Sequence, residues 1–191
     1  MKPQDVLLVK VPARLDSAQA DAVRTGLAAG SALTVTVFAS IESEESYVYC
    51  APAAAEGAAL LSAARDRVAT VCPAGSQACL LAGMVRLEGA SQGASAPWHY
   101  IVETDVTPEF ERELNDWYDQ EHLPGLAGVP GTVRADRYQC LESSPRYYAC
   151  YDLHTRETFG SPPWLAVRAS DWSSRVRPAF RNTKRTMFAR V

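Results

Sequence analysis

Residues 98–124, WHYIVETDVTPEFERELNDWYDQEHLP, contain a predicted strand followed directly by a predicted helix. The first nine of these residues are rich in β-branched and aromatic side chains, which favours a strand. Thr107 stands where a helix N-cap is expected, and Pro108 occupies the first helical position, where a missing N–H does no harm. Since Pro124 cannot continue a helix, we expect this helix to end near Leu123.

The rest of the second half completes a recognisable order of elements. Two further strands, residues 132–142 and 146–153, flank the turn Ser143-Ser144-Pro145. Ser161 is expected to cap another helix, and a last strand covers residues 186–191. The order of predicted elements is therefore βαββαβ.

The first half of the chain repeats that order. Strands are predicted at residues 5–11, 33–39, 46–50 and 78–87, and helices at residues 17–29 and 53–69. Asp16 and Gln19 have the spacing of a capping box at the start of the first helix. The repeat predicts a duplicated chain, with one unit at residues 1–93, a second at residues 94–191, and a linker within residues 89–96 (GASQGASA).

A βαββαβ unit forms a four-stranded antiparallel sheet with both helices on one face. The other face of that sheet is bare, and a second copy in the same chain can cover it. We therefore predict the α+β class, with two tandem units packed as a pseudo-dimer. Such a chain either closes this assembly as a monomer or still forms a homodimer.

The composition excludes several classes of protein. Nucleic-acid binding is not expected, because 19 basic residues face 22 acidic ones and the net charge is −3. The five cysteines are widely spaced and form no CxxC pair, which favours reduced thiols in the cytoplasm over a disulfide framework or a zinc site. No apolar stretch is long enough for a signal peptide or a membrane span, so no membrane partner is expected.

The side chains that carry chemistry are concentrated in the second half. Fourteen of the 17 aromatic residues, and all three histidines, lie at or after Trp98. On the predicted helix, Glu121 and His122 follow Trp117 and Tyr118 by four positions, so they extend an apolar stripe. An acid and a histidine at the buried end of such a stripe can form a carboxylate–imidazole pair for proton transfer. The alternative is a histidine that only caps the last carbonyls of its helix.

The segment 117–138, WYDQEHLPGLAGVPGTVRADRY, followed by the strand PRYYACYDL, resembles the EthD-like branch of the dimeric α+β barrel superfamily. The resemblance covers roughly residues 98–191. It implies ferredoxin-like units that form a dimeric α+β barrel, with ligands bound between the sheet and its helices or loops. It also implies activity without a cofactor or metal, as in the isomerases, dehydratases, decarboxylases and small monooxygenases of this superfamily, and a catalytic role for His122. The first helix of the first unit lacks this motif, so that unit is expected to be a scaffold or one wall of the pocket.

Several other side chains are candidates for substrate binding. Arg134 and Tyr138 share one face of their predicted strand, and Arg137 lies on the opposite face. One of these faces is expected near His122, where a cation or phenol would hold a developing oxyanion. The alternative is a surface arginine paired with Asp136 or Glu142.

Tyr148 and Trp164 complete the set of substrate-binding candidates, together with Trp117 and Tyr118. Tyr148 and Asp152 share one face of their strand, Tyr147 and Tyr151 share the other, and either face can line the pocket. On the last helix, the spacing of Leu165, Ala169, Trp172 and Val176 predicts that Trp172 is core and Trp164 only a weaker candidate.

A basic run near the C-terminus contains Arg175, Arg177, Arg181, Lys184, Arg185 and Arg190. It is expected either to attract an anionic substrate or to be balanced by the acidic helix before His122.

The leading functional hypothesis is a cofactor-free lyase or isomerase acting on a small cyclic or aromatic carbonyl compound. His122 would transfer a proton next to the carbonyl, and Glu121 would orient it. The alternatives are a non-catalytic ligand-binding or stress-response protein of the same fold, and a cofactor-free monooxygenase.

Overall fold

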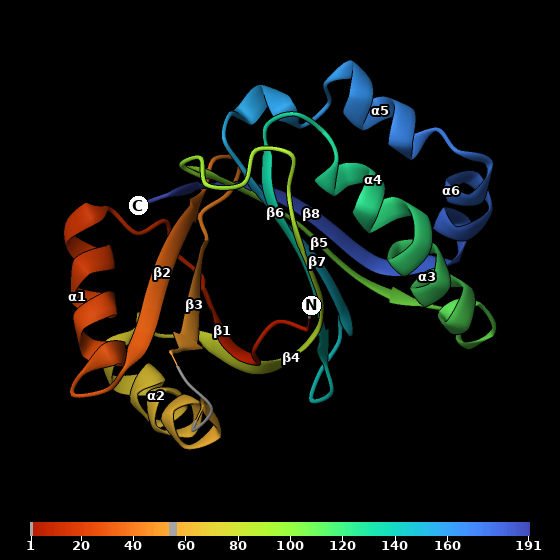
Figure 1. The fold of residues 1–191 in the computed structure, drawn as a ribbon. Coiled ribbons are helices and arrows are strands. Elements are labelled where there is room, and N and C mark those ends of the chain that lie inside the picture. Colours follow the sequence, from red (N-terminus) through yellow and green to blue (C-terminus); the bar gives the residue numbers. More distant parts are fainter. Residues whose placement is uncertain (1, 54–56) are drawn as a thin grey trace. The chain divides into compact units, whose positions relative to one another are not determined.

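A computed structural model describes residues 2–53 and 57–191 (Figure 1). Two units pack separately. The N-terminal unit consists of Gln4–Gly83 with the short segments Cys140–Ser143 and Met187–Val191, and the C-terminal unit consists chiefly of Met84–Gln139 and Ser144–Thr186. These units follow packing rather than chain order, so the boundary at residues 93 and 94 stays a prediction.

The N-terminal unit contains β1 (Val6–Val11), α1 (Ser17–Ala28), β2 (Leu33–Ser40), β3 (Ser46–Pro52), α2 (Gly57–Val71) and the first part of β4 (Gln77–Glu88). Strand β1 pairs antiparallel with β3 and β4, and β2 pairs antiparallel with β3 and with the end of β8. Both helices lie on one face of this sheet (Figure 1). Leu7, Val9 and Val11 alternate along β1 and pack with α1 and α2 in one apolar core.

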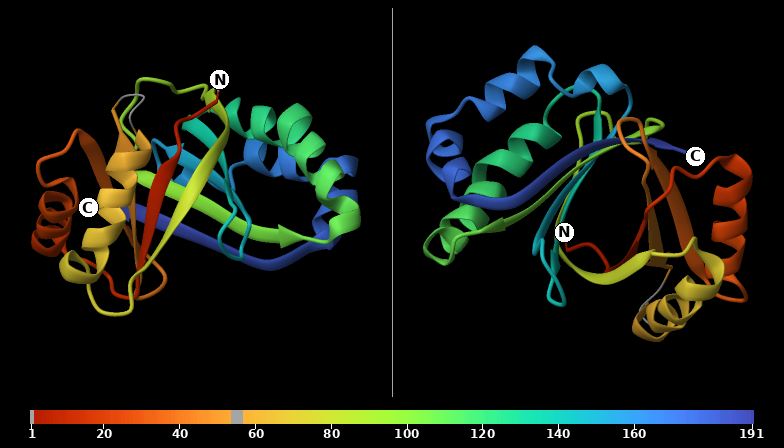
Figure 2. Two further views of the ribbon diagram at one scale, coloured as in Figure 1. Left: turned by 90° about the horizontal axis from the view of Figure 1, so that it is seen from below. Right: turned by 180° about the vertical axis from the view of Figure 1, so that it is seen from behind.

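The C-terminal unit contains β5 (Trp98–Val106), β6 (Thr132–Cys140), β7 (Tyr147–Leu153) and β8 (Phe180–Arg190). Strand β5 pairs antiparallel with β7, and β7 pairs antiparallel with β6. Helices α3 (Glu111–Trp117), α4 (Leu123–Ala127), α5 (Pro162–Arg168) and α6 (Asp171–Val176) lie on one face of this sheet (Figure 2).

Both halves of the chain have the predicted βαββαβ order. Strands β4 and β8 each pair in both units, so the order of pairing, β1-β3-β2-β8-β5-β7-β6-β4, closes on itself. The predicted α+β class is therefore confirmed. The capping box at α1 is also confirmed, since the Asp16 carboxylate accepts from the Gln19 N–H and the Gln19 amide oxygen accepts from the Asp16 N–H. The part of helix 53–69 that falls on residues 54–56 lies outside the described residues.

The prediction that the helix ends near Leu123 is wrong. One π-helical turn, Tyr118–His122, follows α3, and the Leu123 N–H bonds to the Tyr118 carbonyl five residues earlier. This turn lets a new helix, α4, begin with Pro124 in its first turn, where the missing N–H is not needed. The helical path therefore continues to Ala127. Thr107 precedes a short 3-10 turn and makes no side-chain cap bond.

The last predicted helix is divided into α5 and α6. Ser170 interrupts it and caps α6 by accepting from the Ser173 N–H at 3.0 Å. The break changes the phase of the apolar stripe, so Leu165 is 51% exposed and Trp164 is fully buried. Trp172, predicted as core, is only partly buried.

Residues 89–96 do not behave as a free linker. The Gly89 N–H bonds to the Val133 carbonyl, the Ser91 N–H bonds to the Thr132 carbonyl, and the Ser91 hydroxyl accepts from the Gly131 N–H, each at 2.9 Å. This segment is therefore built into the C-terminal unit. In the described residues, no helix is long and apolar enough to cross a membrane.

Candidate functional site

A small cavity lies between the helices and the sheet of the C-terminal unit. Its volume of about 20 Å³ leaves room for about one water-sized molecule. Its floor and walls are mostly aromatic, and its polar side chains are one histidine and three arginines. The lining residues are Tyr100, Val102, Trp117, Tyr118, His122, Leu126, Tyr151, Trp164, Arg168, Arg177, Phe180 and Arg185.

His122 belongs to the π-helical turn between α3 and α4 and lines this cavity. Its ring stacks on Trp117, with centroids 4.1 Å apart and planes inclined by 20°, and meets the edge of Tyr118 at 5.3 Å. Burial lowers the pKa of His122 to about 3, and the charges of Arg168, Arg177 and Arg137 act in the same direction. Burial favours the neutral ring, and no helix end at His122 favours the charged one, because the helical path continues beyond this residue to Ala127.

Three buried polar atoms at this cavity have no hydrogen-bond partner among the described residues. They are Nδ1 of His122, the hydroxyl of Tyr151 and the indole Nε1 of Trp164. Buried polar groups are nearly always paired in folded proteins, so an unpaired cluster around one cavity calls for an explanation. A bound molecule that offers both a donor and an acceptor would satisfy all three.

Glu121 does not orient His122, which differs from the sequence prediction. Its carboxylate accepts from the Trp117 indole Nε1–H at 3.2 Å and from the hydroxyl of Ser170. Glu121 therefore holds Trp117, the ring on which His122 stacks, and ties the π-helical turn to the start of α6. No hydrogen bond joins Glu121 to His122 within the part of the chain that the structure describes.

The basic run near the C-terminus is divided between two roles. Arg175 pairs with Glu113 of the acidic helix, with Nε and Oε1 at 2.6 Å. This agrees with the prediction that the acidic helix balances the basic run. Arg168, Arg177 and Arg185 line the cavity instead, and none of them forms an ion pair with a described carboxylate. Burial and the neighbouring arginines lower the pKa of Arg177, which reflects the concentration of positive charge there.

Arg137 and Arg134 project from opposite faces of β6, as predicted. Arg137 faces the helices and is almost completely buried. Its guanidinium donates to Asp119 at 3.0 Å and to Asn115 at 2.8 Å, and lies 4.4 Å from the Tyr118 ring centroid. Arg137 therefore supports the wall of the cavity and is not a surface arginine paired with Asp136 or Glu142.

Arg134, Tyr138 and Tyr148 lie on the other face of the sheet, away from the helices. Arg134 bridges Asp136 and Asp152, with N–O distances of 3.1 and 2.6 Å, and the Tyr138 hydroxyl donates to Asp136 at 3.3 Å. These three candidates therefore do not join His122 in the helix-side cavity. Tyr151, not Tyr148, is the tyrosine of β7 that lines it.

Of the candidates drawn from the sequence, the structure brings four to this cavity: Trp117, Tyr118, His122 and Trp164. Sequence reasoning missed Tyr100 and Arg168. Arg168 carried a usable signal, since it follows Trp164 by four positions and so shares its helix face. Tyr100 could have been identified from the sequence only if the face of β5 that meets the helices had been known.

Comparison with known proteins identifies the fold. No protein-family model and no curated protein sequence matches the chain. Among solved structures, an anthrone oxidase-like protein has a TM-score of 0.62 at 15% identity, covering 98% of this chain and 91% of its own. A ferredoxin fold protein from Listeria monocytogenes, related to antibiotic biosynthesis monooxygenases, has a TM-score of 0.60 at 7% identity, covering 99% and 95%.

A mutant chlorite dismutase from Candidatus Nitrospira defluvii has a TM-score of 0.57 at 14% identity, covering 96% of this chain and 90% of its own. The chain therefore has the ferredoxin-like α+β fold of these structures. The resemblance to the EthD-like branch in particular stays a prediction.

Proposed function

We propose that the C-terminal unit contains the active site of a cofactor-free enzyme, which transfers a proton from one atom to another of a small cyclic or aromatic carbonyl compound. The observation that carries this proposal is the cluster of three unpaired polar atoms, on His122, Tyr151 and Trp164, around one aromatic cavity. A fold shared with small-molecule enzymes is consistent with it.

His122 is the proton acceptor in this proposal. A neutral imidazole can take a proton from the carbon next to a carbonyl, or from an enol or phenol, and the electron pair left behind moves onto the substrate oxygen. The Tyr151 hydroxyl and the Trp164 indole N–H would donate to that oxygen, and Arg168 and Arg177 would stabilise its charge. The same negative charge offsets the field of the arginines, so the pKa of His122 rises when the anion forms.

Entry of a ring-sized substrate requires side chains at the cavity to move, because the space present holds about one water-sized molecule. Arg185 is exposed and Phe180 is only partly buried, so both can move at little cost. Glu121 is a positioning residue here, since it acts on His122 only through Trp117.

The resulting enolate can react in more than one way. Return of the proton at a different atom is an isomerisation, and departure of a β-hydroxyl group, which takes up the proton and leaves as water, is a dehydration. In a decarboxylation the enolate forms by loss of CO₂ from a β-keto acid, and a proton is then added to its carbon. We place lyase or isomerase chemistry first, because the residues at the cavity are suited to proton transfer.

Oxygenation is the second candidate, and the anthrone oxidase-like and monooxygenase-related structures of similar fold favour it. In that reaction the enolate gives electrons to dioxygen. For anthrone the balance is one anthrone and one O₂ converted to one anthraquinone and one water.

Anthrone is a suitable probe, because its methylene hydrogens exchange with solvent through an enol. Incubation in deuterated buffer without oxygen, followed by NMR, measures proton transfer alone. We expect exchange above the uncatalysed rate with the wild type, its loss in His122→Gln, and its retention in His154→Gln, which alters an exposed histidine away from the cavity.

The same mixtures in air separate the two reaction classes. Oxygen uptake with formation of anthraquinone would assign oxygenation, and exchange without uptake would assign lyase or isomerase chemistry. Binding of anthrone with no exchange, or exchange that survives in His122→Gln, would contradict the proposal and favour a non-catalytic ligand-binding protein.

A further inference from the structure

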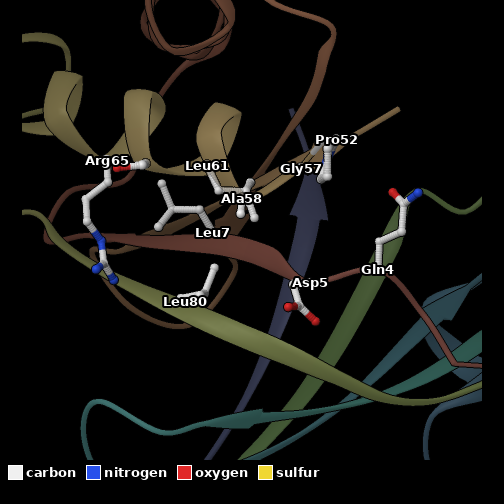
Figure 3. Close-up of a pocket in the computed structure, with 10 residues that line it drawn as sticks. Gln4, Asp5, Leu7, Pro52, Gly57, Ala58, Leu61, Arg65 and Leu80 are labelled. Carbon is white, nitrogen blue, oxygen red and sulfur yellow. The ribbon is translucent and has the colours of Figure 1, made fainter. Parts of the chain in front are cut away.

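The N-terminal unit contains a larger pocket, of about 350 Å³, between α2 and strands β1 and β4 (Figure 3). Leu7 and Leu80 are paired across β1 and β4 and form its floor, and Leu61 and Pro52 form apolar walls. Figure 3 shows Gln4 and Asp5 at one end of the pocket and Arg65 at the other. No residue of the helix-side cavity around His122 takes part in it.

The volume of this pocket matches a small organic ligand. An apolar cavity of about 150 Å³ holds one benzene ring, and ligand pockets in proteins begin at about 300 Å³. The space therefore suits a molecule of about two rings. Ala58, Leu61, Ser62 and Arg65 present one face of α2 to this space, at spacings of three and four residues.

The charges at the pocket favour an uncharged ligand. The Arg65 guanidinium is already paired with the Glu142 carboxylate, with Nη1 and Oε1 at 3.0 Å. The Asp5 carboxylate accepts from the Gly83 N–H at 2.9 Å. The Arg65 charge is therefore balanced by Glu142, and an anionic ligand would meet the negative Asp5 and no unpaired cation at this pocket.

The pocket also has polar groups that a ligand can reach. Gln4 and Ser62 line it and are exposed. An amide or hydroxyl donor beside an apolar floor selects a molecule that carries a single acceptor, such as a carbonyl oxygen.

We propose that this pocket is a second binding site, specific for an uncharged two-ring aromatic molecule that carries a carbonyl group. The site is independent of the proton-transfer chemistry proposed for His122, because it lies in the other unit and shares no residue with it. It assigns ligand binding to a unit that the sequence suggested was only a scaffold or a wall.

The probe is 6-propionyl-2-dimethylaminonaphthalene, an uncharged naphthalene ketone whose fluorescence shifts to the blue in apolar surroundings. We expect one molecule to bind per chain. We further expect 2-acetylnaphthalene to displace it, and 2-naphthoate, which has the same rings and a carboxylate, to be about tenfold or more weaker as a competitor.

Two substitutions fill the pocket from α2, namely Ala58→Phe and Ser62→Phe, at positions that are exposed and so tolerate a larger side chain. Both should weaken probe binding by about tenfold or more. Ala59→Phe is the matched control, because Ala59 is an exposed neighbour that does not line the pocket, and it should bind as the wild type does.

Thermal melts of the three variants serve as the control that each variant is folded. Absence of a blue shift with the wild type would overturn the proposal. So would equal binding by Ala58→Phe and Ser62→Phe, since the probe would then sit elsewhere, or equal competition by 2-naphthoate. His122→Gln should leave probe binding unchanged, so failure of this site and failure of the proton-transfer site are distinguishable.

Discussion

At the scale of single residues, the decisive feature is a neutral histidine in a positive environment. His122 is 6% exposed, and two of the arginines that act on it, Arg168 and Arg177, have no carboxylate partner among the described residues. Burial and like charge act in the same direction on its pKa, so the ring loses its proton far below its ordinary range. The sequence suggested that His122 pairs with Glu121, whereas in the structure it is a neutral acceptor held by ring stacking.

This environment predicts how stability depends on pH. The folded-state pKa of His122 is about 3 and its ordinary value is 6.5, so the unfolded chain takes up the proton first as the pH falls. The stability that the neutral ring confers is complete above pH 6.5 and is lost as the pH falls from 6.5 toward 3. The loss should approach about 1.4 kcal/mol per pH unit below that value.

Urea denaturation from pH 7 to pH 4 measures this loss. His122→Gln should show a shallower decline of the free energy of unfolding with falling pH than the wild type. Gln120→Ala changes an exposed, non-titrating residue of the same turn and should follow the wild type. Parallel curves for His122→Gln and the wild type would contradict the buried, neutral state of His122.

At the scale of elements, the π-helical turn and the break between α5 and α6 decide where the functional side chains lie. The turn places His122 over Trp117, and the break brings Trp164 and Arg168 to the cavity. These two devices depend on close packing of α4 against α5. Gly125 lies at this contact, and a Cβ there would come within 2.7 Å of Cγ1 of Val167.

We expect Gly125→Ala to lower the free energy of unfolding by about 1–3 kcal/mol, because the added methyl group displaces α5. Val167→Ala in the same chain should remove the clash, and alanine then gains about 1 kcal/mol over glycine within the helix. The double variant should therefore be at least as stable as Val167→Ala alone, as judged by urea denaturation. If the loss of stability in the double variant equalled the sum of the losses in Gly125→Ala and Val167→Ala, the two side chains would not interact.

At the scale of the whole molecule, the packed units do not coincide with the two halves of the sequence. The C-terminal unit includes residues from Met84 onward, so it takes part of β4 and the segment predicted as a linker. Arg86 in this part of β4 donates to the buried Asp136 carboxylate through Nε at 2.7 Å and Nη2 at 2.9 Å. A chain cut at the sequence boundary therefore loses a buried ion pair and the backbone bonds of Gly89 and Ser91.

We expect a fragment of residues 94–191 to show no cooperative thermal transition by near-UV circular dichroism. In the fragment, the buried Asp136 carboxylate keeps Arg134 and the Tyr138 hydroxyl but loses its bidentate partner Arg86, and the backbone bonds of Gly89 are lost as well. A small domain has only about 5–15 kcal/mol of stability to lose. The full-length chain, measured in parallel, should melt cooperatively. A cooperative melt of the fragment would show instead that the duplicated halves fold independently.

The sequence by itself determined the order of elements, the α+β class and the half of the chain that holds the histidine cavity. These follow from local properties, namely the two-residue period of strands, helix caps and the clustering of aromatic residues and histidines. It also identified Trp117, Tyr118 and His122, because spacings of three and four residues on one helix face can be read directly. Trp164 was only a weaker candidate, because the break between α5 and α6 is not visible in that spacing.

Only the tertiary structure decided the charge state of His122, the partners of Glu121, and which face of each strand meets the helices. A strand with buried residues on both sides gives no sign of its inward face, so Tyr151 could not be chosen over Tyr148. The π-helical turn was also hidden, because Pro124 disfavours a regular helix and tertiary packing supplied an irregular one. Burial, charge and partner choice depend on residues distant in sequence, and only the folded chain brings those residues together.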